Sequence, residues 1–365
     1  MFAAVLFILC ACSGEPRSIP AGGGATATGS LSISATPIQT IAPLDSEGVA
    51  LFGSIADATR LSSGVIAVVD RAFERVIFVD PAGGLVGRSG RSGEGPGEFR
   101  SIRGIGQCAP DTLFVWDPMN GRMSLLGPDG AFLSAFRPLG DPVDRYCAGS
   151  RRFLAWTRYA SVGNPSADSP PIRAVAVLLS ARGDSVGGLG EIQAGQNWPL
   201  GAITQFAVTD AGIYVGTADT AVVSLYSKSA QWIRAVDVGD ARRATTATEY
   251  DAAIADLVTT LPGTAEQVAG MTAFMHKRFP MPKYLPAYRA LFSNGDGDLF
   301  VITSPVGAGV TEIHVFDKAG ISLGEFRISG DLEIYEIGAA YLLAMVKNPV
   351  GEQRLVVYAL SVETR

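Results

Sequence analysis

The sequence contains little histidine, cysteine or charge, and it lacks long apolar runs. With only two histidines in 365 residues, the chain cannot supply the His-rich ligand set of a catalytic zinc centre. Charged residues make up 18% and the net charge is −6 at pH 7, so the bulk charge indicates no nucleic-acid partner. No run reaches the roughly 20 apolar residues that cross a bilayer, and no Gly-x-Ser-x-Gly, Walker or dinucleotide motif occurs. We therefore predict no catalytic residues, no metal site and no cofactor.

Glycine, proline and apolar residues are abundant. The chain contains 43 glycines and 21 prolines, and 47% of its residues are hydrophobic. That hydrophobic fraction excludes a disordered chain. So many helix-breaking residues exclude a long helical rod or a coiled coil. The length fits one large domain or two.

The N-terminal segment has the pattern of an export signal. Residues 2–9 are an apolar stretch too short to span a bilayer. The Leu-Cys-Ala-Cys sequence that follows resembles a bacterial lipobox, which implies that Cys12 is lipidated. We expect a signal peptide at residues 1–11 and a flexible tether at residues 12–36; the alternative is an ordinary buried strand. The protein would then sit in the cell envelope, on the periplasmic side or the outer membrane surface, attached by its lipid anchor only.

A strand-turn-strand unit recurs along the chain. Its turn ends in a small residue at Gly83, Gly130, Gly183, Ala230 and Gly320, at intervals of 47, 53, 47 and 90 residues. The small residue allows the positive φ that a hairpin turn needs. A second short apolar strand precedes each unit, so each repeat contains about four antiparallel strands. A period of 40–50 residues with four strands is typical of a propeller blade.

The longest interval contains a segment without strand patterning. Within residues 240–284, capping boxes at Thr248-Glu-Tyr-Asp and Thr264-Ala-Glu-Gln predict two short helices. The second helix should end before Pro280. We interpret this segment as a helical insertion between blades 4 and 5.

The last repeat lacks its outermost strand. Residues 334–361 supply three strands, and residues 36–41 near the N-terminus are expected to supply the fourth. Mixing both chain ends in one blade closes the ring and removes the free edge. The sequence therefore predicts an all-β, six-bladed β-propeller over residues 37–365.

One loop carries a resemblance to a known family. Residues 93–99 (Gly-Glu-Gly-Pro-Gly-Glu-Phe), which follow the strand at residues 76–80, resemble the NHL-type signature that joins consecutive blades. The proline-rich residues 279–286 and the strand entry at residues 294–301 are similar to a late blade of the bacterial six-bladed β-propeller lipoprotein family. This resemblance implies the fold and says nothing about a reaction.

Two cysteines remain for the folded domain. Cys108 and Cys147 each precede a strand by the same offset, so we expect them at equivalent places in adjacent repeats. They form either a disulfide, which persists in an exported protein, or two free buried thiols.

Two arginines are the strongest ligand-binding candidates. Aligning the repeats places Arg103 and Arg289 on the innermost strands of blades 2 and 5, which face each other across the ring. Two opposed guanidinium groups would grip a carboxylate or phosphate. The same mouth is expected to contain Arg100, Arg145, Trp198 and Tyr284. The alternative is that the arginines pair with neighbouring backbone carbonyls or acids.

These observations support two function hypotheses. The first is a monomeric binding scaffold for a protein partner or a small anionic ligand, with the helical insertion as a contacting element or lid. The second is a hydrolase or lyase that uses a divalent metal in the axial channel. Neither His276 nor His314 is expected to bind metal. Residues 294–298 are read as a turn, because Pro305 stands where a calcium loop needs its closing Glu.

Overall fold

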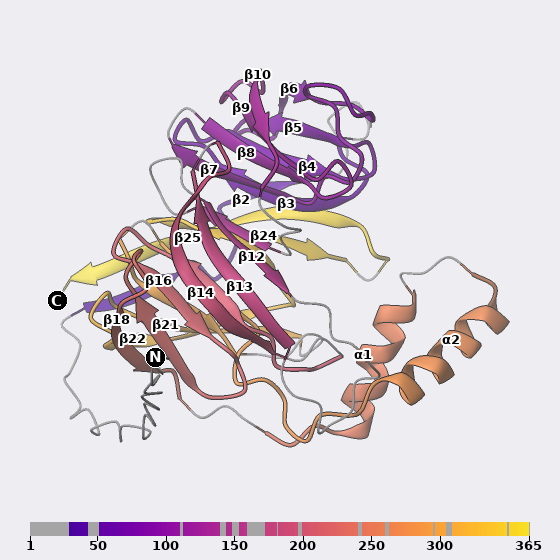
Figure 1. The fold of residues 1–365 in the computed structure, drawn as a ribbon, viewed down its shortest axis with the longest axis vertical. Helices are drawn as coiled ribbons and strands as arrows, with labels where there is room; N and C mark the ends of the chain where they lie inside the picture. The colour runs from indigo at the N-terminus through magenta and orange to yellow at the C-terminus, as the bar shows by residue number, and fades with distance from the viewer. Residues whose placement is uncertain are drawn as a thin grey trace, which may run out of the picture.

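The computed structural model describes residues 29–42, 51–109, 112–138, 144–147, 153–158, 172–180, 182–195, 199–239, 243–259, 263–294, 296–303, 309–348 and 350–364. Within these residues the strands form six antiparallel sheets (Figure 1). Five sheets have four strands that follow one another along the chain, and the sixth combines strands from both chain ends.

The first three sheets follow the chain from residue 55 to residue 195. Their strands are β3 (Ile55–Arg60), β4 (Ile66–Asp70), β5 (Arg75–Val79), β6 (Leu85–Ser89); β7 (Gly104–Ala109), β8 (Thr112–Asp117), β9 (Arg122–Leu126), β10 (Phe132–Phe136); and β11 (Asp144–Cys147), β12 (Phe153–Arg158), β13 (Ile172–Leu179), β14 (Ser185–Gly195).

The other three sheets follow in order, with two helices between the first and the second of them. Their strands are β15 (Gln205–Val208), β16 (Ile213–Gly216), β17 (Val222–Tyr226), β18 (Trp232–Asp237); β19 (Ala290–Ser293), β20 (Leu299–Ile302), β21 (Val310–Phe316), β22 (Ser322–Ser329); and β23 (Glu333–Ile337), β24 (Tyr341–Lys347), β25 (Gln353–Thr364) with β1 (Gly29–Ile33) and β2 (Gln39–Ile41).

The recurring small residue occupies the same turn in five sheets, as predicted. Each one lies between the third and fourth strands and has a positive φ: Gly83 (89°), Gly130 (85°), Gly183 (86°), Ala230 (63°) and Gly320 (82°). The repeat spacing therefore located these hairpins correctly, because a tight turn of this geometry favours a residue with little or no side chain.

The first strands of the sheets form a closed cycle. β3 contacts β7, β7 contacts β11, β11 contacts β15, β15 contacts β19, β19 contacts β23, and β23 contacts β3. The second strands of three sheets, β4, β8 and β20, are buried along their whole length. Both faces of these strands are covered, because each sheet packs between two neighbours. This architecture is an all-β propeller with two helices.

The apolar core is divided into layers between neighbouring sheets. One layer joins Ile66 and Ile77 to Leu343 and Leu355. Another joins Phe78 to Leu113 of the following sheet and to Phe99 of the connection that leads into that sheet. Stability is therefore distributed around the ring, and each layer depends on the presence of both adjoining sheets.

The last sheet is completed by the N-terminal part of the chain. β2 pairs with residues 355–357 of β25, and β1 pairs with residues 360–364 of the same strand. The predicted closure by residues 36–41 is confirmed in β2. The strand β1 corrects the expectation of a flexible tether as far as residue 36. In β1 the apolar residues Leu31 and Ile33 alternate with serines, and this alternation is typical of a strand.

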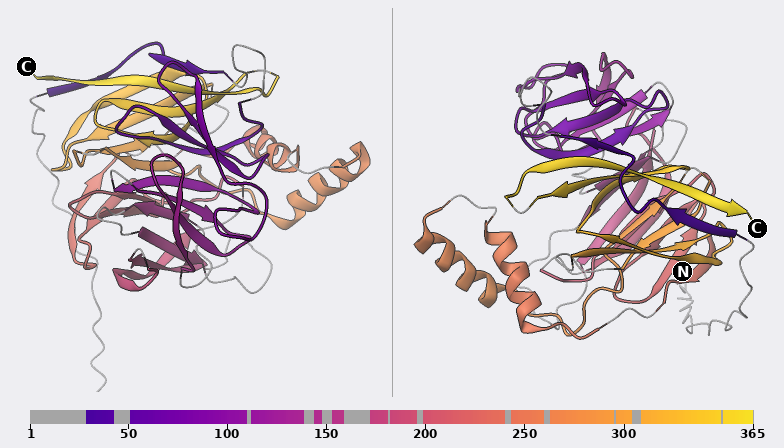
Figure 2. Two further views of the ribbon diagram at one scale, coloured as in Figure 1. Left: turned by 90° about the horizontal axis from the view of Figure 1, so that it is seen from above. Right: turned by 180° about the vertical axis from the view of Figure 1, so that it is seen from behind.

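Two antiparallel helices fill the predicted insertion and project from the side of the propeller (Figures 1 and 2). They are α1 (Ala247–Thr259) and α2 (Ala265–Arg278). The capping box at Thr264 is confirmed: its hydroxyl accepts the Gln267 amide hydrogen bond, and the Gln267 side chain accepts from the Thr264 amide. The box expected at Thr248 is wrong by two residues. Thr246 caps α1 instead, because Glu249 returns to its amide and hydroxyl.

The two cysteines lie on the first strands of adjacent sheets. Cys108 is in β7 and Cys147 is in β11, and these strands contact each other. Their predicted equivalence is confirmed at the level of the strands. Their side chains lie outside the described part of the structure, so the disulfide stays a prediction.

Removing the closing strands tests the ring directly. Deletion of residues 1–41 strips β1 and β2 from β25 and removes the buried Ile41 from its core layer. We expect the free energy of unfolding, measured by urea denaturation, to fall by about 3 kcal/mol or more. Deletion of residues 1–28 is the control, since it leaves every described strand in place. Equal stability of the two truncated chains would contradict closure by these strands.

Candidate functional site

Two buried aspartates hold the connections that lead into the first strands. Asp70 accepts hydrogen bonds from the amides of residues 53 and 54, and Asp117 accepts from the amides of residues 100 and 101. Each aspartate ends the second strand of its sheet, and an arginine follows five residues later, at Arg75 and Arg122. Arg75 Nε lies 3.0 Å from Asp70 Oδ2. Arg122 has a different role, because its side chain donates hydrogen bonds to the neighbouring loop.

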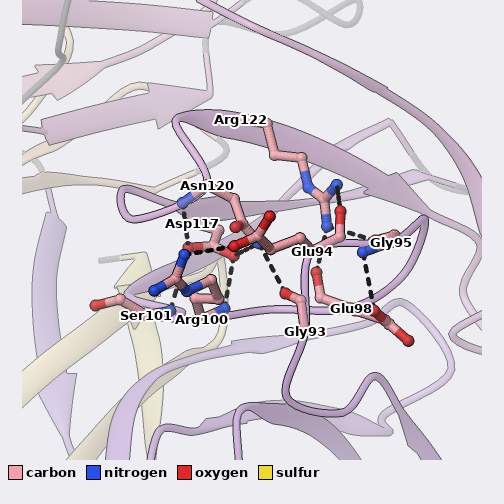
Figure 3. Close-up of polar contacts among 9 residues, drawn as sticks. All are labelled: Gly93, Glu94, Gly95, Glu98, Arg100, Ser101, Asp117, Asn120 and Arg122. Atoms are coloured by element: carbon pink, nitrogen blue, oxygen red, sulfur yellow. Dashed lines mark hydrogen bonds and ion pairs between the residues drawn. The ribbon is translucent and has the colours of Figure 1, made fainter.

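The glycine-rich loop at residues 93–99 is held by a network of polar contacts (Figure 3). The Arg122 guanidinium group donates to the carbonyls of Glu94 (2.7 Å), Gly95 (2.6 Å) and Glu98. Glu98 accepts from the Gly95 amide, and that hydrogen bond, helped by Arg91, lowers the pKa of Glu98. This loop therefore carries no free row of amides for a phosphate.

Gly93 is required by this arrangement. Its φ is 154°, and a Cβ at this position would lie 2.2 Å from the Glu98 Oε2 atom. The glycine of the NHL-like motif thus makes room for the carboxylate that closes the loop. The requirement for glycine at this position is structural, which agrees with the interpretation of the motif as a signature of the fold.

A basic depression lies beside this loop. It has a volume of about 570 Å³ and opens at the end of the sheet where β7 and β9 begin. Its lining comes from the loop, the turn after β8 and the exit from β10: Glu94, Arg100, Pro118, Met119, Asn120, Gly121, Arg122, Arg137 and Pro138. We call this hollow the basic depression.

The three arginines of the basic depression differ in what they contact. Arg122 is fixed by three carbonyls, as described above. Arg100 Nη1 lies 2.5 Å from Glu94 Oε1, and both side chains are exposed. The exposed guanidinium group of Arg137 has no hydrogen-bond or ion-pair partner among the described residues. The lining therefore holds three guanidinium groups against one carboxylate, in a chain whose net charge is negative.

A second hollow, the axial cavity, lies among the first strands. Its volume is about 310 Å³. Residues of β3, β7, β15, β19 and β23 line it, together with Phe114: Asp57, Ala58, Thr59, Ile105, Gly106, Gln107, Phe206, Ala207, Val208, Leu291, Phe292, Ser293, Tyr335, Glu336 and Ile337. It corresponds to the channel expected from the repeat pattern.

Glu336 is a carboxylate in the lining of the axial cavity that is held by several donors. Its oxygens accept from the Thr59 hydroxyl, the Arg60 amide and the Tyr341 hydroxyl, each at 2.8 Å. A β-bulge between Ile334 and Glu336 shifts the register of β23 on β24 at this point. Burial raises the pKa of Glu336, although the three donors oppose the rise.

The acidic residues of the axial cavity connect neighbouring sheets. Glu336 on β23 accepts from the Arg60 amide at the end of β3, and Asp57 on β3 accepts from the Ile105 amide of β7. The Tyr335 hydroxyl is buried nearby without a well-formed hydrogen bond to the described residues. Burial, followed by the charges of Glu333 and Asp57, raises the pKa of Tyr335. Sequence reasoning missed these acids, because their alternation with apolar residues resembles an ordinary strand.

Arg103 and Arg289 occupy equivalent places at the starts of β7 and β19, as the repeat alignment predicts. These strands are separated by two others in either direction around the cycle. Arg103 is exposed. Arg289 is half-buried and donates to the Leu332 carbonyl at 3.1 Å, and burial lowers its pKa. Neither arginine lines the axial cavity; a ligand shared between them stays a prediction.

Of the other predicted ligand-binding residues, the structure describes the side chains of Arg100 and Tyr284, and these two lie in different places. Arg100 lies in the basic depression. Tyr284 is exposed near the helical insertion, with the Lys283 ammonium group 5.1 Å from its ring centre. Arg145 lies on β11, but its side chain is outside the described part of the structure. Trp198 and Cys12 both lie outside the described residues.

The histidines and the Asn294 turn have ordinary structural surroundings. His276 stacks edge-on against Tyr250 and lies 3.7 Å from Asp251, and His314 lies 3.6 Å from Glu325. Asn294 Oδ1 accepts amide hydrogen bonds from residues 296 and 298, which makes the turn between β19 and β20. In the described part of the chain, no group of three or more His, Cys, Asp or Glu side chains is placed to hold a metal ion.

Comparisons with known proteins identify the fold only. No family model and no curated protein matches the chain. A member of the DUF4221 family from Bacteroides vulgatus superposes with a TM-score of 0.56 at 10% identity, covering 93% of this chain and 100% of that one. A Bacteroides fragilis protein, provisionally described as exported, superposes with a TM-score of 0.55 at 12% identity, covering 91% and 95%. Neither described helix is long and apolar enough to cross a membrane.

The raised pKa of Glu336 predicts a pH-dependent contribution to stability. The folded chain keeps this proton at pH values where the unfolded chain has lost it, so this contribution falls as pH rises above about 4.3. We expect the free-energy difference between the parent and Glu336→Gln to shrink from pH 4 to pH 8 in urea denaturation. A difference that grows with pH would contradict the assignment.

The Arg122 network gives a second stability prediction. Arg122→Met leaves three loop carbonyls without their charged donor, so we expect a loss of about 2 kcal/mol in the free energy of unfolding. Arg91→Met is the control, because the Arg91 side chain is largely exposed and its ion pair with Glu98 is a surface pair. Equal effects of the two substitutions would show that Arg122 does not hold the loop.

Proposed function

We propose that this chain is an exported, lipid-anchored six-bladed β-propeller that serves as a binding scaffold and takes a small anionic ligand in its basic depression. The observation that carries the proposal is the convergence of Arg100, Arg122 and Arg137 on one hollow with a single carboxylate, Glu94. The hypothesis of an anionic ligand came from the sequence. The geometry supports it at Arg100, with two arginines that the repeat alignment did not select.

The six sheets are proposed as the blades. The cyclic contacts of the first strands and the pairing of β25 with β1 and β2 support this count. The lipobox-like sequence at Cys12 and the fold similarity to a provisionally exported protein support an envelope location. The proposed species is a monomer.

The chemistry of the depression favours a carboxylate or phosphate. A guanidinium group presents paired N–H donors that match the two oxygens of these anions. Arg122 cannot turn toward a ligand, because its Nη1 and Nη2 groups donate to loop carbonyls, so it contributes fixed positive charge. Arg137 has donors available, and Arg100 can exchange partners.

The Arg100–Glu94 ion pair allows such an exchange at low cost. Both side chains are substantially exposed, and an exposed pair contributes at most about 1 kcal/mol. An incoming carboxylate can therefore replace Glu94 as the partner of Arg100. The net charge of −6 opposes the approach of highly charged polyanions, which favours small ligands.

The alternative function is a hydrolase or lyase that works in the axial cavity with a divalent metal. Its support is the presence of Asp57, Tyr335 and Glu336 around one cavity. Stoichiometric calcium or zinc in the purified protein, measured by elemental analysis, would favour this alternative.

Calorimetric titration tests the anion site. With inorganic phosphate and citrate as probes at low salt, we expect saturable binding to the full chain. The double variant Arg100→Ala with Arg137→Ala should bind at least tenfold more weakly, because each charge-assisted contact contributes about 1.4 kcal/mol or more. Raising the ionic strength should weaken binding to the parent.

The matched control is Arg327→Ala, which removes an exposed arginine from β22. This variant should bind both probes as the parent does. Absence of saturable binding in the parent, or unchanged affinity in the double variant, would overturn the anion site.

A further inference from the structure

The helix α2 is supported on one side only. None of its residues is buried. Val268 and Met275 pack against Tyr250, Ile254 and Val258 of α1, which form a separate small core. Figures 1 and 2 show the helix pair extending away from the sheets, with α2 as its outer member. The rest of the α2 surface therefore faces away from the propeller.

This outward surface carries apolar side chains. Phe274 is 56% exposed and Met271 is 37% exposed, and they are three residues apart, so they lie side by side on the helix. Met281 and Tyr284, in the segment after α2, are also exposed. We call these four exposed residues, two on α2 and two in the segment that follows it, the outer apolar face. Within α2, the residues that pack on α1 are Val268 and Met275.

Basic residues flank the outer apolar face. Lys277 follows Phe274 by one helical turn, and Lys283 lies beside Tyr284. Both lysines are exposed, whereas the acidic residue of α2, Glu266, is at the opposite end of the helix. A helix with Phe and Met on one side and lysines at its border has the pattern of an interfacial membrane-binding helix.

We propose that the outer apolar face inserts into the headgroup region of an anionic lipid bilayer. The lysines match the negative surface of such a bilayer. A second copy of this chain fits less well, because a stable interface needs about 800 Å² from each partner. Four partly exposed side chains offer less apolar area than that. Shallow insertion, in contrast, requires only a few apolar side chains with basic neighbours.

This contact is independent of the anion site and of the lipid proposed on Cys12. The outer apolar face would hold the propeller in one orientation on the membrane.

A tryptophan placed at residue 274 reports insertion directly. The Phe274→Trp variant of the full chain is mixed with vesicles of brominated phosphatidylglycerol, which quench an inserted indole. We expect at least half of the fluorescence added by this substitution to be lost, and much less loss with brominated phosphatidylcholine. In the same background, Lys277→Glu with Lys283→Glu should reduce the quenching at least fivefold.

Val86→Trp is the matched control, because Val86 is equally exposed but lies on β6, at the far end of the molecule from the helices (Figure 1). Its added fluorescence should not be quenched. The N-terminal segment is the same in every variant, so it does not affect the comparison.

Two results would overturn the proposal. One is an unquenched Trp at residue 274 in anionic vesicles while the circular dichroism spectrum is that of the parent. The other is a concentration-dependent dimer in analytical ultracentrifugation that Phe274→Ser abolishes, which would assign the outer apolar face to a second copy. Neither result bears on phosphate or citrate binding in the basic depression.

Discussion

Several strands of this protein have apolar side chains on both faces of their sheet, and only neighbouring sheets can cover both faces. Strands such as β4 and β8 are buried along their whole length, and a strand of this kind is unstable unless it is covered on either side. A ring satisfies the requirement for every sheet at once, because it leaves no first or last member. The pairing of β25 with β1 and β2 follows from the same constraint, since it joins the chain ends in one sheet.

Polar side chains hold together neighbouring first strands and the connections that lead into them. The first strands of neighbouring sheets share carboxylate bridges, through Glu336 and Asp57, to backbone amides. At the entrances to the first strands, Asp70 and Asp117 hold the incoming connections, and Arg122 fixes the loop before β7. These anchored loops form the rigid support on which exposed arginines can be presented. The scaffold and the candidate anion site are thus built from the same hydrogen-bonding groups.

The helical insertion is stabilised in a different way from the sheets. Its small core joins α1 to α2 without drawing α2 onto the sheets. The surface of α2 is therefore available for an external partner. In this protein the ring provides rigidity and the insertion provides a projecting apolar surface, and the two are separated in space (Figure 1).

The sequence alone determined the repeat, the turn positions at residues such as Gly83 and Gly130, the insertion and the closing strand near residue 40. These features follow from local rules: alternation in strands, positive φ in tight turns, and capping at Thr264. It did not determine that residues 29–33 form a strand, because that depends on the unpaired edge of β25. Nor did it place Arg100 with Arg122 and Arg137, or Asp57 near Glu336. Such groupings join residues from different strands and sheets, and only the twist and closure of the ring bring their side chains together.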